Sequence, residues 1–211
     1  MNKSSKSNGF TLVELLVAMV ITGIVSAAIF STFLFQQKSY LIQEQVAEMQ
    51  QNLRAAMNMT VRDIRMAGYD PDRTSQTGFV AATGNSTSYT LISDNDTLKT
   101  ITYSLYDSSA DGDNDIGRKI DAGYNQPIAE NIENMEFYYT LEDTTQTLIP
   151  ADLNNIRNVQ ITILAKTGRK DPKFKNTKQY TTPSGANWGP YNDGFHRSLL
   201  STTVKCRNMG S

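Results

Sequence analysis

Apolar and polar positions follow two different patterns in the first third of the chain. Between Phe10 and Gln37 there is no Lys or Arg, and Glu14 is the only formally charged residue. As a helix, this stretch is long enough to cross a hydrocarbon core of roughly 30 Å. The pattern therefore predicts a membrane-spanning helix over 10–37, in preference to a buried helix of a soluble domain.

The second pattern, over 38–68, is that of an amphipathic helix. Apolar residues recur every three or four positions and draw one stripe along a helix: Ile42, Val46, Met49, Leu53, Met57, Val61 and Ile64. Gly68, followed by Pro71, predicts the end of the helix. The stripe must pack against another element, although a membrane anchor with an amphipathic stalk would show the same spacing.

Short alternating runs follow from about Gly78, which is typical of antiparallel strands. The clearest runs are 87–93, 98–107, 135–141, 159–165 and 199–206. In 98–107 the alternate residues Ile101, Tyr103 and Leu105 share one face, and 135–141 and 159–165 alternate in the same way. A sheet with one apolar face needs a cover, and the stripe of 38–68 can provide it. We therefore expect an α+β fold with a β-rich globular domain over 69–211.

Composition makes several classes of function less plausible for this chain. The chain has 20 basic and 21 acidic residues, one cysteine, Cys206, and one histidine, His196. The balanced charge gives no reason to expect a nucleic-acid partner. A single cysteine excludes an intramolecular disulfide and any multi-cysteine metal site, and one histidine leaves little material for a catalytic triad. We expect a protein that is not an enzyme.

The residues around the apolar segment indicate its topology and processing. Lys3 and Lys6 precede the segment and Lys38 follows it, a slight bias toward a cytoplasmic N-terminus. A secretory signal peptide has a shorter apolar region with its cleavage site after it. Here Gly9 comes before the apolar run, so cleavage at Gly9 would remove a leader of residues 1–9 and retain the helix.

The stretch GFTLVELL after a short Lys-containing leader resembles the class III signal of type IV pilins and type II secretion pseudopilins. The resemblance implies a pilin-like fold, in which a long N-terminal helix packs its second half on an antiparallel sheet. It also implies that a membrane aspartyl peptidase, the prepilin peptidase, cuts between Gly9 and Phe10. Phe10 would then become N-methylphenylalanine, and Glu14 matches the acid of the family.

A carboxylate in the membrane segment has a physical explanation in a filament. An unpaired charge in an apolar medium is costly, so ionised groups within membranes usually have a partner. The free amino group of Phe10 in one subunit could pair with Glu14 of its neighbour. The alternative is that Glu14 lies at the membrane interface, in contact with headgroups and water.

Further segments indicate which member of the family this is. Many major pilins have a cysteine pair and a proline about twenty residues into the helix, where this chain has one cysteine and Ser31. The segments RDIRMAGYDP, AENIENMEFYYT and RSLLSTTVKCRN resemble PilW minor pilins and the related J-type pseudopilins. We expect a minor pilin that acts in initiation or tip assembly of a type IV pilus. The alternatives are a J-type pseudopilin of a type II secretion system and, from another class, a membrane-anchored adhesin or binding module.

The resemblance also implies partners and a location. The partners would be the prepilin peptidase, other minor pilins, the major pilin, the inner-membrane assembly platform and inner-membrane lipid. The chain would cross the inner membrane once, with its C-terminal domain in the periplasm. It would then enter an extracellular pilus or a periplasmic pseudopilus.

An acidic run, SSADGDNDIG, is a candidate calcium loop. Asp111, Asp113 and Asp115 alternate as oxygen ligands do in such loops. Against this, Ile116 stands where the EF-hand pattern has glycine, and Asp, Gly and Asn also form turns without a metal. No other cofactor is expected.

Three single residues lead to structural expectations. His196 is expected at the surface or a strand edge. Cys206 alternates with Val204 and Leu200 and should be a buried small hydrophobe. Trp188, in a loop rich in glycine and proline, could either plug one end of the sheet or anchor a partner.

Overall fold

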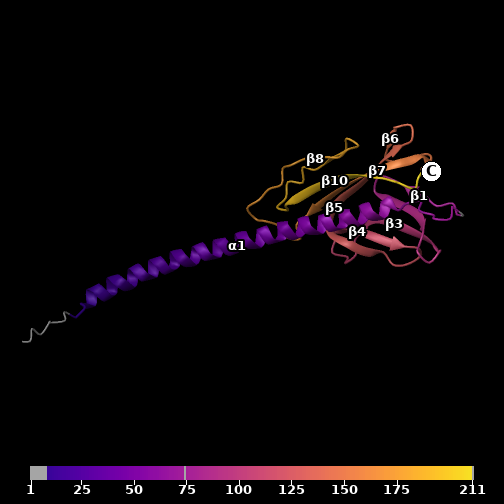
Figure 1. The fold of residues 1–211 in the computed structure, drawn as a ribbon. Coiled ribbons are helices and arrows are strands. Elements are labelled where there is room, and N and C mark those ends of the chain that lie inside the picture. Colours follow the sequence, from indigo (N-terminus) through magenta and orange to yellow (C-terminus); the bar gives the residue numbers. More distant parts are fainter. Residues whose placement is uncertain (1–8, 74, 211) are drawn as a thin grey trace, which may run out of the picture. The chain divides into compact units, whose positions relative to one another are not determined.

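The computed structural model describes residues 9–73 and 75–210. Its chain divides into two units, Met1–Glu44 and Gln45–Ser211. One helix, α1, comprises the 54 residues Leu12–Arg65 (Figure 1). The two predicted helical segments, 10–37 and 38–68, together extend two residues beyond it at the N-terminal end and three at the C-terminal end. Gly68 has a φ of 77°, the left-handed conformation that commonly ends helices, so the predicted stop is confirmed.

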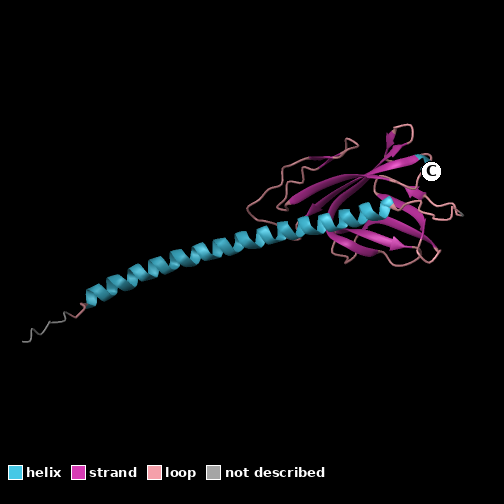
Figure 2. Ribbon diagram, in the orientation of Figure 1, coloured by secondary structure: helices cyan, strands magenta, loops and turns pink. Residues whose placement is uncertain are grey.

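The second unit contains an antiparallel sheet (Figure 2). Its strands run in the order β1 (Phe79–Ala82), β2 (Ser86–Ile92), β3 (Leu98–Tyr106), β4 (Asn114–Ile120), β5 (Gln126–Leu141), β7 (Ile156–Lys166) and β10 (Arg197–Lys205). A short strand, β6 (Gln146–Thr147), also pairs with β5, and a 3-10 turn, Leu153–Asn155, precedes β7. Two further short strands, β8 (Tyr180–Thr181) and β9 (Asn187–Trp188), follow β7 in the chain and pair only with each other. The expected α+β architecture, one long helix followed by an antiparallel sheet, is confirmed.

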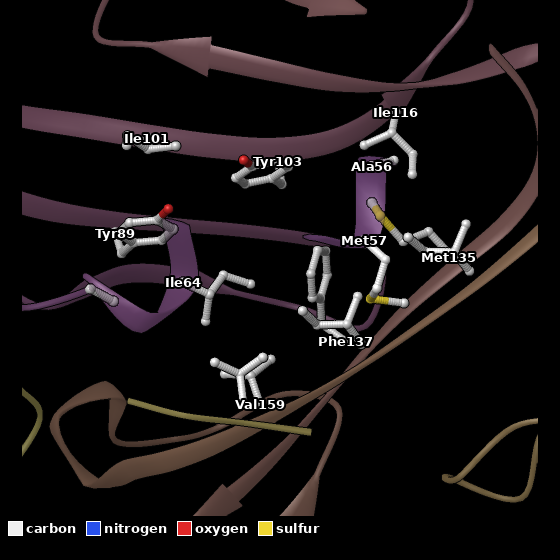
Figure 3. Close-up of a cluster of buried hydrophobic side chains, with 14 of the residues drawn as sticks. Ala56, Met57, Ile64, Tyr89, Ile101, Tyr103, Ile116, Met135, Phe137 and Val159 are labelled. Atoms are coloured by element: carbon white, nitrogen blue, oxygen red, sulfur yellow. The ribbon is translucent and has the colours of Figure 1, made fainter. Parts of the chain in front are cut away.

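The core lies between the second half of α1 and one face of the sheet (Figure 3). Four residues of the predicted stripe are buried, namely Met49, Leu53, Met57 and Ile64, and Val46 and Val61 pack against the core. Ala56 and Thr60 are also buried, and the Thr60 hydroxyl donates to the Ala56 carbonyl, 2.9 Å away. Small side chains on this face allow the helix backbone to approach the sheet.

The predicted strand faces are also confirmed. The inward residues of β3, β5 and β7 are buried or partly buried in the core: Ile101, Tyr103, Leu105, Met135, Phe137, Tyr139, Leu141, Val159, Ile161, Ile163 and Ala165. Phe137 of β5 stands opposite Ile161 of β7. Because successive side chains of a strand point to opposite faces, this register places the apolar sets of both strands on one side.

Strand β4 departs from the sequence prediction, which assigned its first residues to a turn. Ile116 is fully buried, but the next residue on that face is Arg118. Its Nε donates to Asp63 of α1 at 2.7 Å, and the Tyr103 hydroxyl donates to the same carboxylate oxygen at 2.8 Å. An inward cation breaks the apolar alternation, so the pattern hides the strand. Its partner lies 55 positions away in the sequence.

Candidate assembly site at the start of the helix

The start of α1 is organised by Thr11 and Glu14. Thr11 precedes the first helical residue, and its backbone N–H and hydroxyl both donate to Oε2 of Glu14, at 2.8 and 2.9 Å. The N–H of Glu14 donates to Oγ1 of Thr11 at 3.3 Å. This reciprocal arrangement is a capping box, with Thr11 as N-cap and Glu14 at the third helical position. Glu14 therefore has a function within its own chain.

The capping box leaves the Glu14 carboxylate able to accept a hydrogen bond from another chain. Both Thr11 donors use the same carboxylate oxygen, Oε2, so Oε1 can receive an external cation. The Glu14 side chain is exposed within this unit. The geometry therefore permits the expected pairing with a neighbour's Phe10 amine, which stays a prediction.

Thr11 was missed by the sequence analysis, although the signal was present. Thr-x-x-Glu directly before an apolar run is a capping-box signature. Of the other predicted processing residues, Gly9 and Phe10 directly precede Thr11, and leader residues 1–8 lie outside the described part of the chain.

The first unit exposes a continuous apolar surface. Phe10 is 90% exposed, and none of the most apolar window of α1 is buried. By length and composition, α1 is the one helix in the described residues that could cross a membrane. Its two neighbouring hydroxyls, Ser31 and Thr32, both donate to the Ala28 carbonyl at 2.9 Å. Because they are satisfied inside the helix, these hydroxyls can enter an apolar environment at low cost.

The acidic run does not gather its three carboxylates. Asp115 lies in β4 rather than in the turn, is buried, and accepts bonds from the backbone N–H and hydroxyl of Ser108. Asp113 pairs with Lys166. Asp111 accepts from the N–H of Asp113 at 2.9 Å, a bond that lowers the pKa of its exposed carboxyl.

Within residues 9–73 and 75–210, no group of three or more His, Cys, Asp or Glu side chains is placed to hold a metal ion. The structure therefore corrects the extent of the turn, because β4 begins at Asn114. Calcium binding by Asp111, Asp113 and Asp115 stays a prediction without support from this geometry.

The three single residues have clear places. Cys206 is buried, and burial raises the pKa of its thiol to about 12, so the thiol is unreactive. His196 is half-buried; its Nε2 lies 3.2 Å from Asp171 and its ring stacks on Phe174. Trp188 is half-buried in β9 opposite Tyr180, which leaves both of its predicted roles open.

A buried arginine ties the segment between β7 and β10 to the sheet. The Arg197 side chain is 1% exposed. It donates to Glu133 of β5 at 3.0 and 2.7 Å and to Asp193 at 2.6 and 2.7 Å, and these bonds lower the pKa of the Asp193 carboxyl. Its guanidinium lies 3.9 Å from the Tyr191 ring centroid. Sequence reasoning missed this cluster because Glu133 lies 64 positions from Arg197 in the sequence.

Replacing Arg197 is expected to destabilise the globular unit. Arg197→Ala leaves two carboxylates without their cation and should cost about 3 kcal/mol of unfolding free energy. At this size the melting temperature should fall by about 9 °C. The measurement is a thermal melt of the full chain in non-ionic detergent, followed by fluorescence of Trp188, the only tryptophan.

Two variants control this experiment. Arg197→Lys keeps the charge but loses the planar fork, so its loss should be intermediate. Arg169→Ala removes an exposed arginine and should change stability by no more than about 0.5 kcal/mol. Equal melting temperatures for wild type and Arg197→Ala would contradict a stabilising role.

Protein-family models match both the N-terminal helix and the globular unit of this chain. The model of the prokaryotic N-terminal methylation motif matches residues 4–30, the region of the capping box and the apolar segment. The model of type IV pilus-assembly protein W, PilW, matches residues 88–208. The chain belongs to the PilW family. This match runs from within β2 to just beyond β10 and covers more than half of the chain.

A solved structure supports the pilin-like fold of this PilW-family chain. The type IV-like pilin TTHA1219 from Thermus thermophilus superposes with a TM-score of 0.56 at 15% identity, covering 78% of this chain and all of that one. At that identity the likeness concerns the fold alone. No curated protein matches the chain in sequence.

Membership in the PilW family defines the general function. The chain is a minor pilin of the type IV pilin class, and the family and fold are those of structural, non-enzymatic proteins. The methylation motif implies processing by prepilin peptidase and assembly with other pilins. The motif and the exposed apolar helix fit a membrane-anchored pilin.

Proposed function

We propose that this PilW-family chain initiates a type IV pilus or assembles at its tip. Prepilin peptidase cuts between Gly9 and Phe10, removes the leader 1–9 and methylates Phe10. The segment 10–37 holds the chain in the inner membrane, 38–68 continues the helix, and 69–211 forms the periplasmic domain. The assembly platform then transfers the chain into the filament.

The observation that carries this proposal is the exposed apolar surface around Glu14. Within the first unit, side chains such as Phe10, Leu12 and Val13 are largely exposed. Lipid can cover them but offers Glu14 no cation inside the hydrocarbon region. A bundle of pilin helices covers the apolar surface and brings in the methylated, positively charged amine of another Phe10. The start of the helix is thus completed by neighbouring pilins.

A position at initiation or the tip is supported by differences from major pilins. The chain has one cysteine, which is buried, so it lacks their closing disulfide. Helix α1 continues through Ser31, where many major pilins carry proline. The rival is a J-type pseudopilin of type II secretion, with the same signal, and the PilW match favours the pilus.

The proposal is tested by deleting the gene in its host and restoring it from a plasmid. We expect loss of surface pili and twitching, recovery with the full chain, and unchanged exoprotein secretion. Antibody pull-down of sheared, cross-linked pili should recover the chain with other pilins in substoichiometric amount. Normal pili with lost secretion would favour the pseudopilin. Normal pili that no longer adhere would favour the binding module.

A further inference from the structure

The last residue of β7 and the stretch that follows it toward β8 carry an unusual concentration of positive charge. Residues 166–178, here called the basic segment, read KTGRKDPKFKNTK. Its cations are Lys166, Arg169, Lys170, Lys173, Lys175 and Lys178, and its one acid is Asp171. The formal net charge of the whole chain is −1. The balanced total therefore conceals a strongly basic stretch of irregular backbone.

The basic segment is held in place by the chain that returns to β10. The N–H of Asp171 donates to the Gly194 carbonyl at 2.8 Å, and the N–H of Asn176 donates to the Asp193 carbonyl at 2.7 Å. Asn176 is 2% exposed. Its side-chain amide donates to the Tyr180 hydroxyl and the Phe195 carbonyl, at 3.1 and 3.2 Å. The cations of the basic segment therefore project from an ordered backbone, which reduces the conformational entropy lost on binding.

The acids near the basic segment are engaged inside the protein. The Asp171 carboxylate accepts from the N–H of Lys173 at 2.9 Å and contacts His196. Asp193 is bound by Arg197, and Asp113 is bound by Lys166. In contrast, the exposed cations Arg169, Lys170, Lys175 and Lys178 form no salt bridge within the described ranges. Their charge is available to an external anion.

Aromatic rings lie among these cations. Phe174 is 37% exposed and stacks on His196, with ring centroids 3.9 Å apart. Lys170 lies 5.4 Å from the Phe195 ring centroid, and Lys178 lies 5.1 Å from that of Tyr180. Several cations and a partly exposed ring within one short segment combine the chemistry that binds a single nucleic-acid strand, namely contacts to phosphates and stacking of bases.

We propose that the basic segment binds a single-stranded nucleic acid, mainly through its phosphates. Three of the four exposed cations that form no salt bridge are lysines, which bind phosphate as point charges. Lysine is also depleted at protein–protein interfaces, which disfavours an acidic protein. A lipid surface would require more exposed apolar side chains than Phe174. The balanced total charge gave no reason to expect a nucleic-acid partner, whereas the local charge of the basic segment favours one.

The test compares two triple variants of the full chain in non-ionic detergent. Lys170→Gln, Lys175→Gln and Lys178→Gln neutralise the basic segment; Lys99→Gln, Lys119→Gln and Lys205→Gln remove the same charge elsewhere. Binding to a labelled single DNA strand of about 30 nucleotides is followed by fluorescence anisotropy as salt is raised. The basic-segment variant should bind at least about tenfold more weakly, with a log–log salt slope smaller by about 2, whereas the control should match wild type.

Several results would overturn this proposal. Equal losses in the two triple variants would show a general charge effect, and equally tight binding of polyglutamate would show that phosphate is not recognised. Binding of anionic vesicles but not of DNA would assign the segment to membranes. If the triple variant melts early, each single variant should still lower the slope by about 0.7. The variant should still support piliation, so failure here is separate from failure of the assembly role.

Discussion

Glu14→Gln is expected to leave the helix start intact and yet exclude the chain from filaments. Glutamine can occupy the third position of a capping box, so the bond from the Thr11 N–H should persist. The negative charge is lost, and a neighbour's Phe10 ammonium then lies unpaired in an apolar bundle, which costs several kcal/mol. Since about 1.4 kcal/mol is a factor of ten, incorporation should fall at least about tenfold.

Two companion variants separate the charge of Glu14 from its capping function. Thr11→Ala keeps the charge and loses the hydroxyl of the cap, at a cost of about 0.5–2 kcal/mol to the helix start, and should still be incorporated. Glu14→Ala loses both and should be excluded. The measurement is the ratio of each variant in sheared filaments to that in membranes, by immunoblot. Wild-type incorporation of Glu14→Gln would reduce Glu14 to a capping residue.

Gly9→Leu should abolish processing without affecting the fold. A Cβ atom at Gly9 meets no other atom within 4 Å, so the folded chain does not itself need glycine there. Any strict requirement must come from the peptidase that binds this position. Mass spectrometry should find the uncut, unmethylated chain in cells with active prepilin peptidase, and none in filaments.

Gly23→Leu provides a matched control for Gly9→Leu. Gly23 also has open space around its Cβ position, but it lies inside α1, away from the cut. It should be processed and methylated at Phe10 as in wild type. Normal cleavage of Gly9→Leu would place the processing site elsewhere. A processed Glu14→Gln chain and an unprocessed Gly9→Leu chain would show that the two substitutions block assembly at different steps.

Periodicity was sufficient for the main elements of the fold. Strand β7 and the stripe of α1 bury apolar residues on one face, so their period appears in the sequence. Strand β4 was missed because Arg118 takes an inward position and is paired with Asp63 on the helix. Such compensation depends on tertiary contact, and no local pattern reports it.

The candidate sites also divide into those that local sequence predicts and those that depend on tertiary contacts. A processing signal is a contiguous motif, so the sequence alone was enough to name Gly9, Phe10 and Glu14. The same motif contains the Thr-x-x-Glu spacing that would also have identified Thr11. The Arg197 cluster could not, because Glu133 and Asp193 meet only after β5 and β10 have been placed. Alternation of Asp111, Asp113 and Asp115 suggested a loop, but the third acid belongs to a strand and faces Ser108.

The capping box also bears on what cleavage does to the chain. Thr11 and Glu14 both lie after the proposed cut, and none of their mutual bonds involves Gly9 or Phe10. The helix can therefore begin at the same residue in precursor and mature forms. Cleavage at the proposed site would then add a cation just before a helix start that is already folded, so no refolding would have to precede polymerisation.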